Sequence, residues 1–387
     1  MALLKIKLSR NIRKHILRGH PWVYKDSIEQ PKQKITDCQL CLVLDPKGEE
    51  LAWAMYDPFC PLSLRILNIG KPPNDQFYQA RFQKAYNLRK SVRSELTTCY
   101  RLFNGEGDWL PGMICDVYDN MAVLQFDGEG PSQFWKKDFI ADWILKNTHV
   151  ETVVEKLRRS PDKSLILLGG KNYEAEKIVK ENGVLFKVNV EKGQKTGFFL
   201  DQRDNRNYVR QMCQGQSLLN MFSYSGGFSI YAGLGGASRV ASLDIASGAI
   251  AMANENWLLN SLPKEKHQGI CMDVFEYLKN DAELWDHIII DPPSMGHSEE
   301  KKALAMQKYI ELFAAGAKRV VNNGHLYVSS CSSHISFNDF FEIINESLAI
   351  AKRKGQILRI SGQGSDHPFP HSSHEFRYLK FVHIVLD

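Results

Sequence analysis

The sequence predicts an α/β protein in which a doubly wound sheet forms the C-terminal half and two smaller domains precede it. From about residue 184, strand-like runs alternate with helical stretches, as in a parallel sheet that has helices on both faces. The first 70 residues or so contain short strand-like runs and turn residues, and the next segment mixes strands with helices. We therefore expect domains at residues 1–72, 73–183 and 184–387.

Length and composition are those of a folded, soluble protein of two or three domains. The chain has 387 residues, of which 43% are hydrophobic and 24% charged. No stretch approaches the roughly 18 uninterrupted apolar residues that a membrane-spanning helix requires. Charged residues near the N-terminus stand where a signal peptide has its apolar core, so we expect a cytoplasmic protein whose eight cysteines are reduced.

Positive charge is concentrated at the N-terminus. The whole chain has a net charge of +5, whereas residues 1–34 hold nine basic and two acidic residues, a local net charge of +7. Such a cluster binds the phosphates of a nucleic acid through counterion release, but it can equally be a solvated surface. The interleaved rings of His15, His20, Trp22 and Tyr24 favour RNA, because flat rings stack on unpaired bases.

The first two domains are predicted to be a small β-barrel and an α+β domain. In the barrel we expect a short helix near residues 9–19 and strands at 40–44 and 62–67. For the second domain the pattern predicts helices at 75–94 and about 132–147, with strands at 100–104, 112–118, 121–126 and 151–157. The basic side chains at 81–93 are interpreted as a solvated face, with RNA contact as the alternative.

The third domain alternates strands and helices in the order of a doubly wound sheet. Strands are expected at residues 217–222, 239–243, 268–271, 286–290, 324–330, 356–360 and 376–386. Helices are expected at about 227–234, 247–260, 299–322 and 336–352. Ligands of such sheets bind outside the carboxyl ends of the strands, so polar residues at those ends are the candidates for function.

A glycine turn after the first of these strands indicates a nucleoside site. Gly226 and Gly227 permit a tight strand-to-helix turn and close approach of a ligand to the backbone. Asp244 ends the next strand, eighteen residues beyond Gly226, at about the spacing where a carboxylate reaches ribose hydroxyls, and a third strand leads to Asp273. The chain has neither G-x-G-x-x-G nor a P-loop, so a ligand with an adenosine end and no phosphate fits better.

Asp291 and Cys331 are predicted to meet at the same edge of the sheet. The run His287-Ile-Ile-Ile290 is typical of a strand buried on both faces, and Asp291-Pro-Pro-Ser294 follows it. The next strand, at 324–330, leads to Cys331, and we expect the two strands to be neighbours. A lone cysteine is more often a small buried hydrophobe, but its placement opposite Asp291 favours a catalytic thiol.

Five segments, spread over essentially the whole chain, carry a family resemblance. They are Arg18-Gly-His-Pro-Trp-Val-Tyr24, Lys195-Thr-Gly-Phe-Phe-Leu-Asp-Gln-Arg203, Asn220-Met-Phe-Ser-Tyr-Ser-Gly-Gly-Phe228, Asp291-Pro-Pro and Ser330-Cys-Ser332. In this order they resemble the motifs of the bacterial large-subunit ribosomal RNA cytosine-5 methyltransferase I family. The second and the last segments are the most specific, because the glycine turn alone indicates only an S-adenosylmethionine fold.

The resemblance implies a fold, a cofactor and site residues. The fold is a Rossmann-like class I methyltransferase domain whose last strand is antiparallel, with an N-terminal PUA-type β-barrel that binds RNA and a middle α+β domain. The cofactor is S-adenosyl-L-methionine, with Asp201 and Arg203 nearby, and no metal is implied. Residues assigned to the cofactor by position are Phe222, Ser223, Tyr224, Gly226, Asp244 and Asp273. Cys331 becomes the nucleophile, and the implied product is 5-methylcytidine in 23S rRNA or its precursor.

The chemistry of cytosine agrees with that assignment. Carbon 5 is too weak a nucleophile to take a methyl group from a sulfonium, so a thiolate must first add to carbon 6. Charge then develops on the O2/N3 side of the ring, where a protonated Asp291 can donate a hydrogen bond. An ordinary thiol, with a pKa of about 8.5, is only a few per cent ionised at neutral pH, so the site must lower that pKa or take the proton during attack. The target base must be unpaired or flipped out.

Other interpretations stay open. An RNA guanine-N methyltransferase of the same fold would have no use for the thiol, and an RNA-binding ribosome-assembly factor would transfer no methyl group. A homodimer is one open oligomeric state. Ser294 stands where some RNA cytosine-5 methyltransferases have a second cysteine that helps product release, so release must proceed otherwise.

Two groups of potential metal ligands are discounted. Cys38 and Cys41 have C-x-x-C spacing but no second pair. His367, His371 and His374 are interleaved with prolines that exclude an aligning helix, so we expect a loop there, with the active site as one place it could cover.

Overall fold

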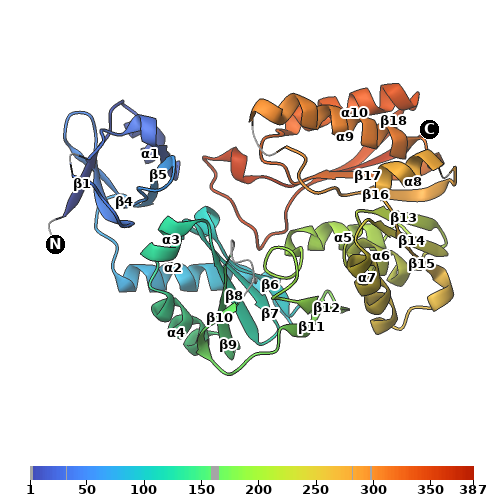
Figure 1. Cartoon of the computed structure of the whole chain (residues 1–387), viewed down its shortest axis with the longest axis horizontal. Helices are drawn as coiled ribbons and strands as arrows, with labels where there is room; N and C mark the ends of the chain where they lie inside the picture. Colours follow the sequence, from blue (N-terminus) through green and yellow to red (C-terminus); the bar gives the residue numbers. More distant parts are fainter. Residues whose placement is uncertain (1–2, 32, 158–164, 281, 297–298) are drawn as a thin grey trace. The chain divides into compact units, whose positions relative to one another are not determined.

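The chain packs into two compact units. The computed structural model describes residues 3–31, 33–157, 165–280, 282–296 and 299–387. Unit 1 contains Met1–Val179, Val188–Leu200 and Ser365–Phe376, and unit 2 contains Lys180–Lys187, Asp201–Gly364 and Arg377–Asp387. Figure 1 shows the elements of both units along the chain. The domain boundaries at residues 72 and 183 stay sequence predictions, although the two five-stranded sheets of unit 1 lie on either side of residue 72.

The first sheet of unit 1 encloses a small apolar core. Its strands are β1 (Leu4–Lys7), β2 (Trp22–Tyr24), β3 (Gln39–Leu44), β4 (Glu50–Tyr56) and β5 (Leu62–Asn68), in the order β1-β3-β4-β5-β2. β1 is parallel to β3, and the other pairs are antiparallel. The helix expected near residues 9–19 is α1 (Arg13–Leu17), which buries Ile16 against Ile6, Val43 and Leu64.

The second sheet of unit 1 is covered by helices. Its strands are β6 (Cys99–Asn104), β7 (Met113–Tyr118), β8 (Met121–Phe126), β9 (Thr152–Lys156) and β10 (Leu165–Gly170), in the order β10-β9-β8-β7-β6. The helices are α2 (Asp75–Leu88), α3 (Glu129–Phe134) and α4 (Lys137–Asn147). Extended backbone at Lys136 divides the predicted helix 132–147 into α3 and α4. β10 was not predicted, because its residues are half-buried or exposed and show no clear alternation.

The basic side chains at 81–93 do not all face solvent, and the predicted solvated face is wrong for Arg81 and Arg89. Arg89 is 0% exposed, and its guanidinium donates to both carboxylate oxygens of Asp108 at 2.6 Å. It also donates to the backbone carbonyls of Arg101 and Asp366, each at 2.9 Å. Arg81 donates to the carbonyls of Leu67 and Trp109. These arginines therefore hold unit 1 together, because a buried charge requires such partners.

Replacing Arg89 should destabilise unit 1. Arg89→Met leaves the Asp108 carboxylate as a buried charge without its cation, so we expect the free energy of unfolding to fall by about 3–5 kcal/mol. Lys84→Met, at an exposed position of α2, is the matched control and should change it by less than about 0.5 kcal/mol. Urea unfolding followed by tryptophan fluorescence measures both. Equal unfolding free energies for the two variants would contradict this account.

Unit 2 contains a seven-stranded sheet. Its strands are β13 (Ser217–Met221), β14 (Arg239–Asp244), β15 (His267–Cys271), β16 (Trp285–Ile290), β17 (Val320–Ser330), β18 (Gly355–Ser361) and β19 (Lys380–Leu386). The order is β15-β14-β13-β16-β17-β19-β18. β19 is antiparallel to both of its neighbours and the remaining pairs are parallel, which confirms the expected antiparallel last strand. β16 and β17 are neighbours, as predicted.

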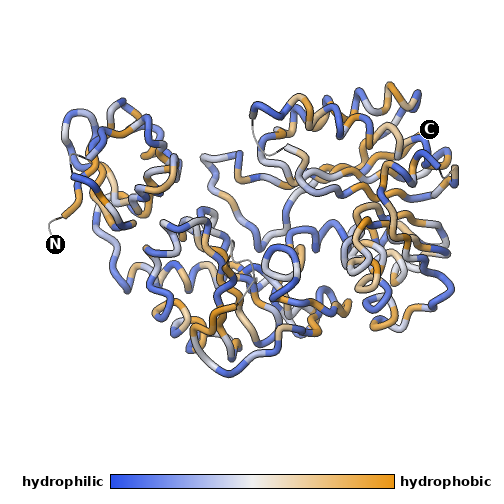
Figure 2. The backbone as a smooth tube through the Cα atoms, viewed as in Figure 1, coloured by the Kyte–Doolittle hydropathy of each residue, from blue (hydrophilic) through white to orange (hydrophobic). Residues whose placement is uncertain are grey.

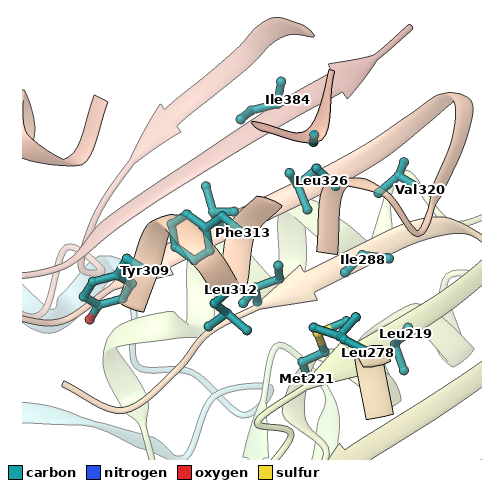
Figure 3. Packing of buried hydrophobic residues seen from close by; sticks show 14 of the residues in the cluster. Leu219, Met221, Leu278, Ile288, Tyr309, Leu312, Phe313, Val320, Leu326 and Ile384 are labelled. Atoms are coloured by element: carbon teal, nitrogen blue, oxygen red, sulfur yellow. The ribbon is translucent and has the colours of Figure 1, made fainter. Parts of the chain in front are cut away.

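Alternate residues of these strands pack against helices on the two faces of the sheet. The helices are α5 (Arg203–Arg210), α6 (Gly227–Leu234), α7 (Ser247–Leu259), α8 (Val274–Asn280), α9 (Lys302–Ala317) and α10 (Phe337–Ala351). Leu218 belongs to a core with side chains of α6 and α7, whereas Leu219 belongs to a core with side chains of α8, α9 and α10. Figure 3 shows part of the second core, and Figure 2 shows hydrophobic residues along the central strands. The doubly wound prediction is therefore confirmed.

Some elements differ from the sequence prediction. α5, of eight residues, and α8, of seven residues, were not predicted. α9 ends at Ala317 rather than at 322, since β17 begins at Val320. A two-stranded hairpin, β11 (Glu176–Glu181) and β12 (Val184–Asn189), was also missed. Among the described residues, no helix combines the length and the hydropathy needed to cross a membrane.

Candidate active site

The predicted site residues of unit 2 gather where β13, β14, β16 and β17 end. Parallel strands present their carboxyl ends at one edge of a sheet, so residues that follow neighbouring strands lie close together. The turn after β13 carries Phe222, Ser223 and Tyr224, and Asp244 is the last residue of β14. Asp291 directly follows β16 and Cys331 directly follows β17. The parallel strands of unit 2 thus bring both halves of the predicted site to one edge.

The turn after β13 has an unusual backbone. Phe222 and Tyr224 have positive φ values of 57° and 46°, a conformation that costs energy for residues with a side chain. The Ser223 N–H donates to the carbonyl of Leu243 at 3.0 Å, and the Gly226 N–H donates to the carbonyl of Ser223 at 2.8 Å. These hydrogen bonds tie the strained turn to β14 and close it on itself. Backbone strain of this kind is typical of ligand sites.

The two glycines of the turn are required by packing within the protein. Gly226 has φ +78°, and a Cβ there would lie 2.9 Å from the Cβ of Ala253 in α7. A Cβ at Gly227 would lie 2.9 Å from the Cδ of Arg206. The sequence interpretation, close approach of a ligand to the glycine backbone, stays a prediction beside this packing requirement. The two glycines let α6 and α7 lie close together and let Arg206 pack under the turn.

Arg206 is itself held by a buried ion pair. Its guanidinium donates to the two carboxylate oxygens of Glu181 at 2.8 and 2.6 Å, and both side chains are at most 3% exposed. Burial alone would lower the pKa of Arg206, but the Glu181 carboxylate raises it overall. The support under the glycine turn is thus a permanent cation with a fixed partner.

Asp244 is oriented by backbone donors. Its Oδ2 accepts from the Tyr224 N–H and its Oδ1 from the Ala246 N–H, both at 2.9 Å. The carboxylate therefore stays next to the strained turn, where the predicted contact to ribose hydroxyls needs it. Asp273 lies one strand further along and is exposed. Its Oδ1 accepts from the N–H groups of Phe275 and Glu276 at 2.9 and 3.0 Å, so this carboxylate caps α8.

Two hydroxyls of the turn fit a polar ligand. The Oγ atoms of Ser223 and Ser225 are buried and have no hydrogen-bond partner among the described residues. Buried hydroxyls normally find a partner, so a ligand with donors or acceptors would complete this site. Together with the Asp244 carboxylate, they suit the polar atoms of a nucleoside such as the one in S-adenosylmethionine.

The motif from Lys195 to Arg203 is divided between the two units, and the described contacts leave the cofactor roles of Asp201 and Arg203 as predictions. In unit 1, the Thr196 hydroxyl hydrogen-bonds the Tyr118 hydroxyl at 2.8 Å. In unit 2, Asp201 is 2% exposed and accepts from the Tyr378 hydroxyl at 2.6 Å. Arg203 begins α5, is 2% exposed and contacts Asp204 at 3.2 Å.

Gln202, which the sequence analysis did not single out, connects the ends of β16 and β17. Its Nε2 donates to Asp291 Oδ2 at 3.0 Å and to the Ser329 hydroxyl at 3.1 Å. Its Oε1 accepts from Asn205 Nδ2 at 2.7 Å, and Asn205 also donates to the carbonyl of Gly362. The Asp291 carboxylate is therefore positioned by an amide that is itself held. The only sequence signal was the place of Gln202 within the quoted motif.

Cys331 lies on a tightly held loop. It is partly exposed, whereas Ser330 and Ser332 on either side are 0% and 1% exposed. The Ser330 hydroxyl donates to the Tyr309 hydroxyl at 3.1 Å, and the Ser332 hydroxyl donates to the carbonyl of Gly296 at 2.9 Å. Pairing of Ile290 with Val328 places Asp291 level with Ser329, two residues before Cys331. Cys331 is thus only partly buried, and its loop follows the strand next to that of Asp291.

His367, Cys38 and Cys41, which the sequence analysis discounts as metal ligands, are buried within unit 1. His367 is 2% exposed and contacts the Asp366 carboxylate at 3.0 Å, in the segment 365–376 of unit 1. Asp366 and Pro368 in turn accept from the side chains or backbone of Arg89, Arg101 and Asn104, so this segment packs on the second sheet of unit 1. Cys38 and Cys41 are buried, and burial raises the pKa of Cys38 to about 12. No cluster of three or more metal-ligating side chains occurs among the described residues.

Comparisons with known proteins identify the family. A family model described as S-adenosylmethionine-dependent methyltransferase matches residues 140–347, and a PUA-like domain model matches residues 6–68. The chain is 34% identical to a ribosomal RNA large subunit methyltransferase of Deinococcus radiodurans, over 99% of this chain and 98% of that protein. It is 31% identical to ribosomal RNA large subunit methyltransferase I of Pseudoalteromonas atlantica, over 97% of this chain and 98% of that protein.

Solved structures agree with the sequence relatives. A putative SAM-dependent methyltransferase from Streptococcus mutans has a TM-score of 0.86 at 26% identity and covers 99% of this chain and 100% of that chain. A putative methyltransferase complexed with SAH has a TM-score of 0.87 at 26% identity, with both chains covered completely. The protein with the strained turn after β13 and the thiol after β17 therefore belongs to the S-adenosylmethionine-dependent methyltransferase family, with a PUA-like domain at its N-terminus.

Proposed function

We propose that this methyltransferase forms 5-methylcytidine in large-subunit ribosomal RNA through a covalent adduct between Cys331 and carbon 6 of the base. The observation that carries the proposal is the placement of Cys331 and Asp291 after neighbouring parallel strands, at the edge that also carries the turn after β13. A methyltransferase that modifies a ring nitrogen or an exocyclic amine needs no thiol there. A partly exposed cysteine on a fixed loop is what covalent catalysis requires.

The turn after β13 would hold the cofactor. Phe222, Ser223, Tyr224 and Gly226 would line the site, Asp244 would accept from the ribose hydroxyls, and Asp273 is proposed to contact the same cofactor. When bound, S-adenosylmethionine supplies an electrophilic methyl group on a sulfonium. The buried hydroxyls of Ser223 and Ser225 and the fixed carboxylate of Asp244 support this assignment. Asp201 and Arg203 follow in the chain and are proposed to border the same site.

Cys331 and Asp291 have different roles in the proposed reaction of the base. The Cys331 thiolate forms a bond to carbon 6, and the electron pair of the C5–C6 double bond becomes available at carbon 5. Charge spreads to the O2/N3 side of the ring, where the Asp291 carboxyl group donates a hydrogen bond. After carbon 5 has gained the methyl group it loses its proton to a base, the double bond re-forms, and the C6–S bond breaks to release the thiolate.

Gln202 sets the orientation that Asp291 needs for this role. Its amide donates to Oδ2 of Asp291, and we propose that the carboxyl group presents Oδ1 to the base. The same amide donates to Ser329 in the neighbouring strand, so the carboxyl group is fixed relative to the strand that carries Cys331. Preorganised donors of this kind stabilise charge that develops in a transition state without further rearrangement.

The relatives and the first sheet of unit 1 support RNA as the substrate. Two full-length relatives are named as large subunit ribosomal RNA methyltransferases, and the PUA-like model covers the basic N-terminal segment. Lys14, Arg18 and Tyr24 are exposed there. The indole N–H of Trp22 donates to Glu106 at 2.8 Å and its ring contacts Phe376, and stacking of Trp22 on a base stays a prediction. The oligomeric state, including a homodimer, stays a prediction.

Cys331→Ala should abolish methyl transfer to cytosine while leaving the fold intact, because alanine is smaller and the cysteine is partly exposed. Incorporation of a labelled methyl group into unmodified large-subunit rRNA, with nucleoside mass analysis, measures it. Cys271→Ala is the control, since this exposed cysteine is the last residue of β15 and has no proposed role. Full activity of Cys331→Ala would rule out the covalent route and favour methylation of another atom.

Asp244→Ala should weaken S-adenosylmethionine binding by at least about tenfold, or roughly 1.4 kcal/mol, because it removes a ribose acceptor and the anchor of the Tyr224 N–H. Isothermal titration calorimetry measures the affinity. Glu255→Ala, an exposed carboxylate on α7, should bind like the wild type. Unchanged affinity in Asp244→Ala would place the cofactor elsewhere, and no binding by the wild type would favour a non-catalytic RNA-binding protein.

Reversing two charges on α1 and at its end should weaken RNA binding in a salt-dependent way. If Lys14 and Arg18 contact phosphates, the double variant Lys14→Glu/Arg18→Glu loses about two contacts that release counterions. The plot of log affinity against log salt then becomes shallower, and the magnitude of its negative slope decreases by about 1.4–1.8. Fluorescence anisotropy with an rRNA fragment at several KCl concentrations measures the slope. Lys318→Glu in unit 2 is the control. An unchanged slope in the double variant would remove α1 from the RNA-binding surface.

A further inference from the structure

A buried lysine lies against the loop that carries Cys331. Lys380 is the first residue of β19 and pairs in register with Ser330, the residue before Cys331. Its side chain is 1% exposed. The Nζ donates to the carbonyl of Ser332 at 2.6 Å and to the carbonyl of Ile335 at 2.7 Å. An ammonium group is therefore held against the backbone directly after Cys331.

Burying a charged group at position 380 costs free energy, and the need to hold the loop does not explain why the group is charged. The next two residues of β19, Phe381 and Val382, are fully buried and apolar. A neutral amide could also donate to a backbone carbonyl, so holding the loop does not by itself require a charge. Burial lowers the pKa of Lys380 to about 8, while the nearby Cys331 and Asp339 oppose that change. At neutral pH the side chain is therefore mostly an ammonium ion.

We propose that the Lys380 ammonium stabilises the thiolate form of Cys331 and so sets the fraction of enzyme that carries an attacking nucleophile. The inference rests on the nucleophilic role proposed above for Cys331. A cation in a site of low dielectric favours the charged form of a neighbouring thiol. The S–H bond breaks and its proton goes to solvent, while Lys380 keeps its own proton, so the ion pair forms without another reactant. Lys380 acts through Cys331 and is a positioning residue.

Two charged groups packed near the loop offset each other. Asp339 of α10 forms an ion pair with Lys302 of α9 at 2.9 Å. Its carboxylate also accepts from the backbone N–H and the hydroxyl of Ser336 at 2.8 and 2.6 Å, and these contacts lower the pKa of Asp339 although burial opposes them. The pair therefore contributes little net charge to the loop.

The remaining titratable groups around the loop do not supply a buried cation. Asp291, after β16, has a carboxyl group and supplies no positive charge. Burial raises the pKa of Tyr309, on α9, to about 12, so its hydroxyl is neutral. His334 belongs to the loop itself, and Arg377 is exposed and stacks on the ring of Phe337 at 4.0 Å. Within the described part of the chain, Lys380 is the cation buried against this loop.

The rate of cysteine alkylation as a function of pH tests the proposal, because only the thiolate reacts. Full-length protein is treated with iodoacetamide from pH 5 to pH 10, and modification of the Cys331 and Cys271 peptides is followed by mass spectrometry. Lys380→Gln keeps a donor for the loop carbonyls but removes the charge, and Lys380→Arg keeps the charge. Lys318→Gln, at the end of α9 before β17, is the matched control.

We expect Cys331 of the wild type to react with a pH midpoint below that of the exposed Cys271. In Lys380→Gln the Cys331 rate at pH 7 should fall by about tenfold and its midpoint should move to higher pH, with Cys271 unchanged as an internal reference. Lys380→Arg and Lys318→Gln should resemble the wild type. S-adenosylmethionine affinity within about twofold of the wild-type value shows that each variant is folded.

A purely structural role of Lys380 would give a different result. The alkylation midpoint of Cys331 would then be the same in Lys380→Gln and the wild type, and this outcome overturns the inference. It would leave the proposed function intact as long as Cys331→Ala remains inactive. If the inference holds, methyl transfer by Lys380→Gln should recover toward the wild-type rate as the pH rises above 9, which a misplaced loop would not do.

Discussion

The parallel pairing of β16 with β17 is the constraint on which the proposed chemistry depends. Ile290 stands opposite Val328, so the two strands end at the same edge of the sheet with Asp291 and Cys331 on successive loops. A shift of one residue in this register would turn each side chain of the shifted strand to the opposite face of the sheet and move Cys331 relative to Asp291. The Gln202 amide, which donates to Asp291 and to Ser329 at once, supports the same register.

Buried charges support this edge and the separate core of unit 1 in the same way. Arg206 with Glu181 lies under the glycine turn, Lys380 lies under the Cys331 loop, and Arg89 with Asp108 lies inside unit 1. Each charge is fixed by several donors and acceptors, because an ion without such partners is strongly destabilising in the interior. Arg206 and Lys380 each place a cation next to a segment of the proposed site. Rigid support from residues behind the reacting groups is what a strained turn and a partly exposed nucleophile require.

The sequence predicted the parts of the site that depend on local patterns. Three isoleucines before Asp291 indicate a central strand, and the end of a central strand is a ligand edge in this fold class. Gln202 and Lys380 could not be found in this way, because their partners lie far away in the chain: Gln202 is 127 residues from Ser329, and Lys380 is 48 residues from Ser332. The helix periodicity also placed Arg81 and Arg89 in solvent, since it cannot show an acidic partner from another element. The glycines were correctly placed in a turn, but the sequence pattern does not show that Ala253 and Arg206 pack closely against them.

A trapped covalent complex is the most direct measurement of the central claim. RNA that contains 5-fluorocytidine at the target position should form a stable adduct with the wild-type protein in the presence of S-adenosylmethionine, because fluorine at carbon 5 blocks the proton removal that releases the thiolate. Peptide mass mapping should locate the adduct on Cys331. Failure to form an adduct on an RNA that the enzyme methylates when it contains ordinary cytidine, or an adduct on another residue, would contradict the account.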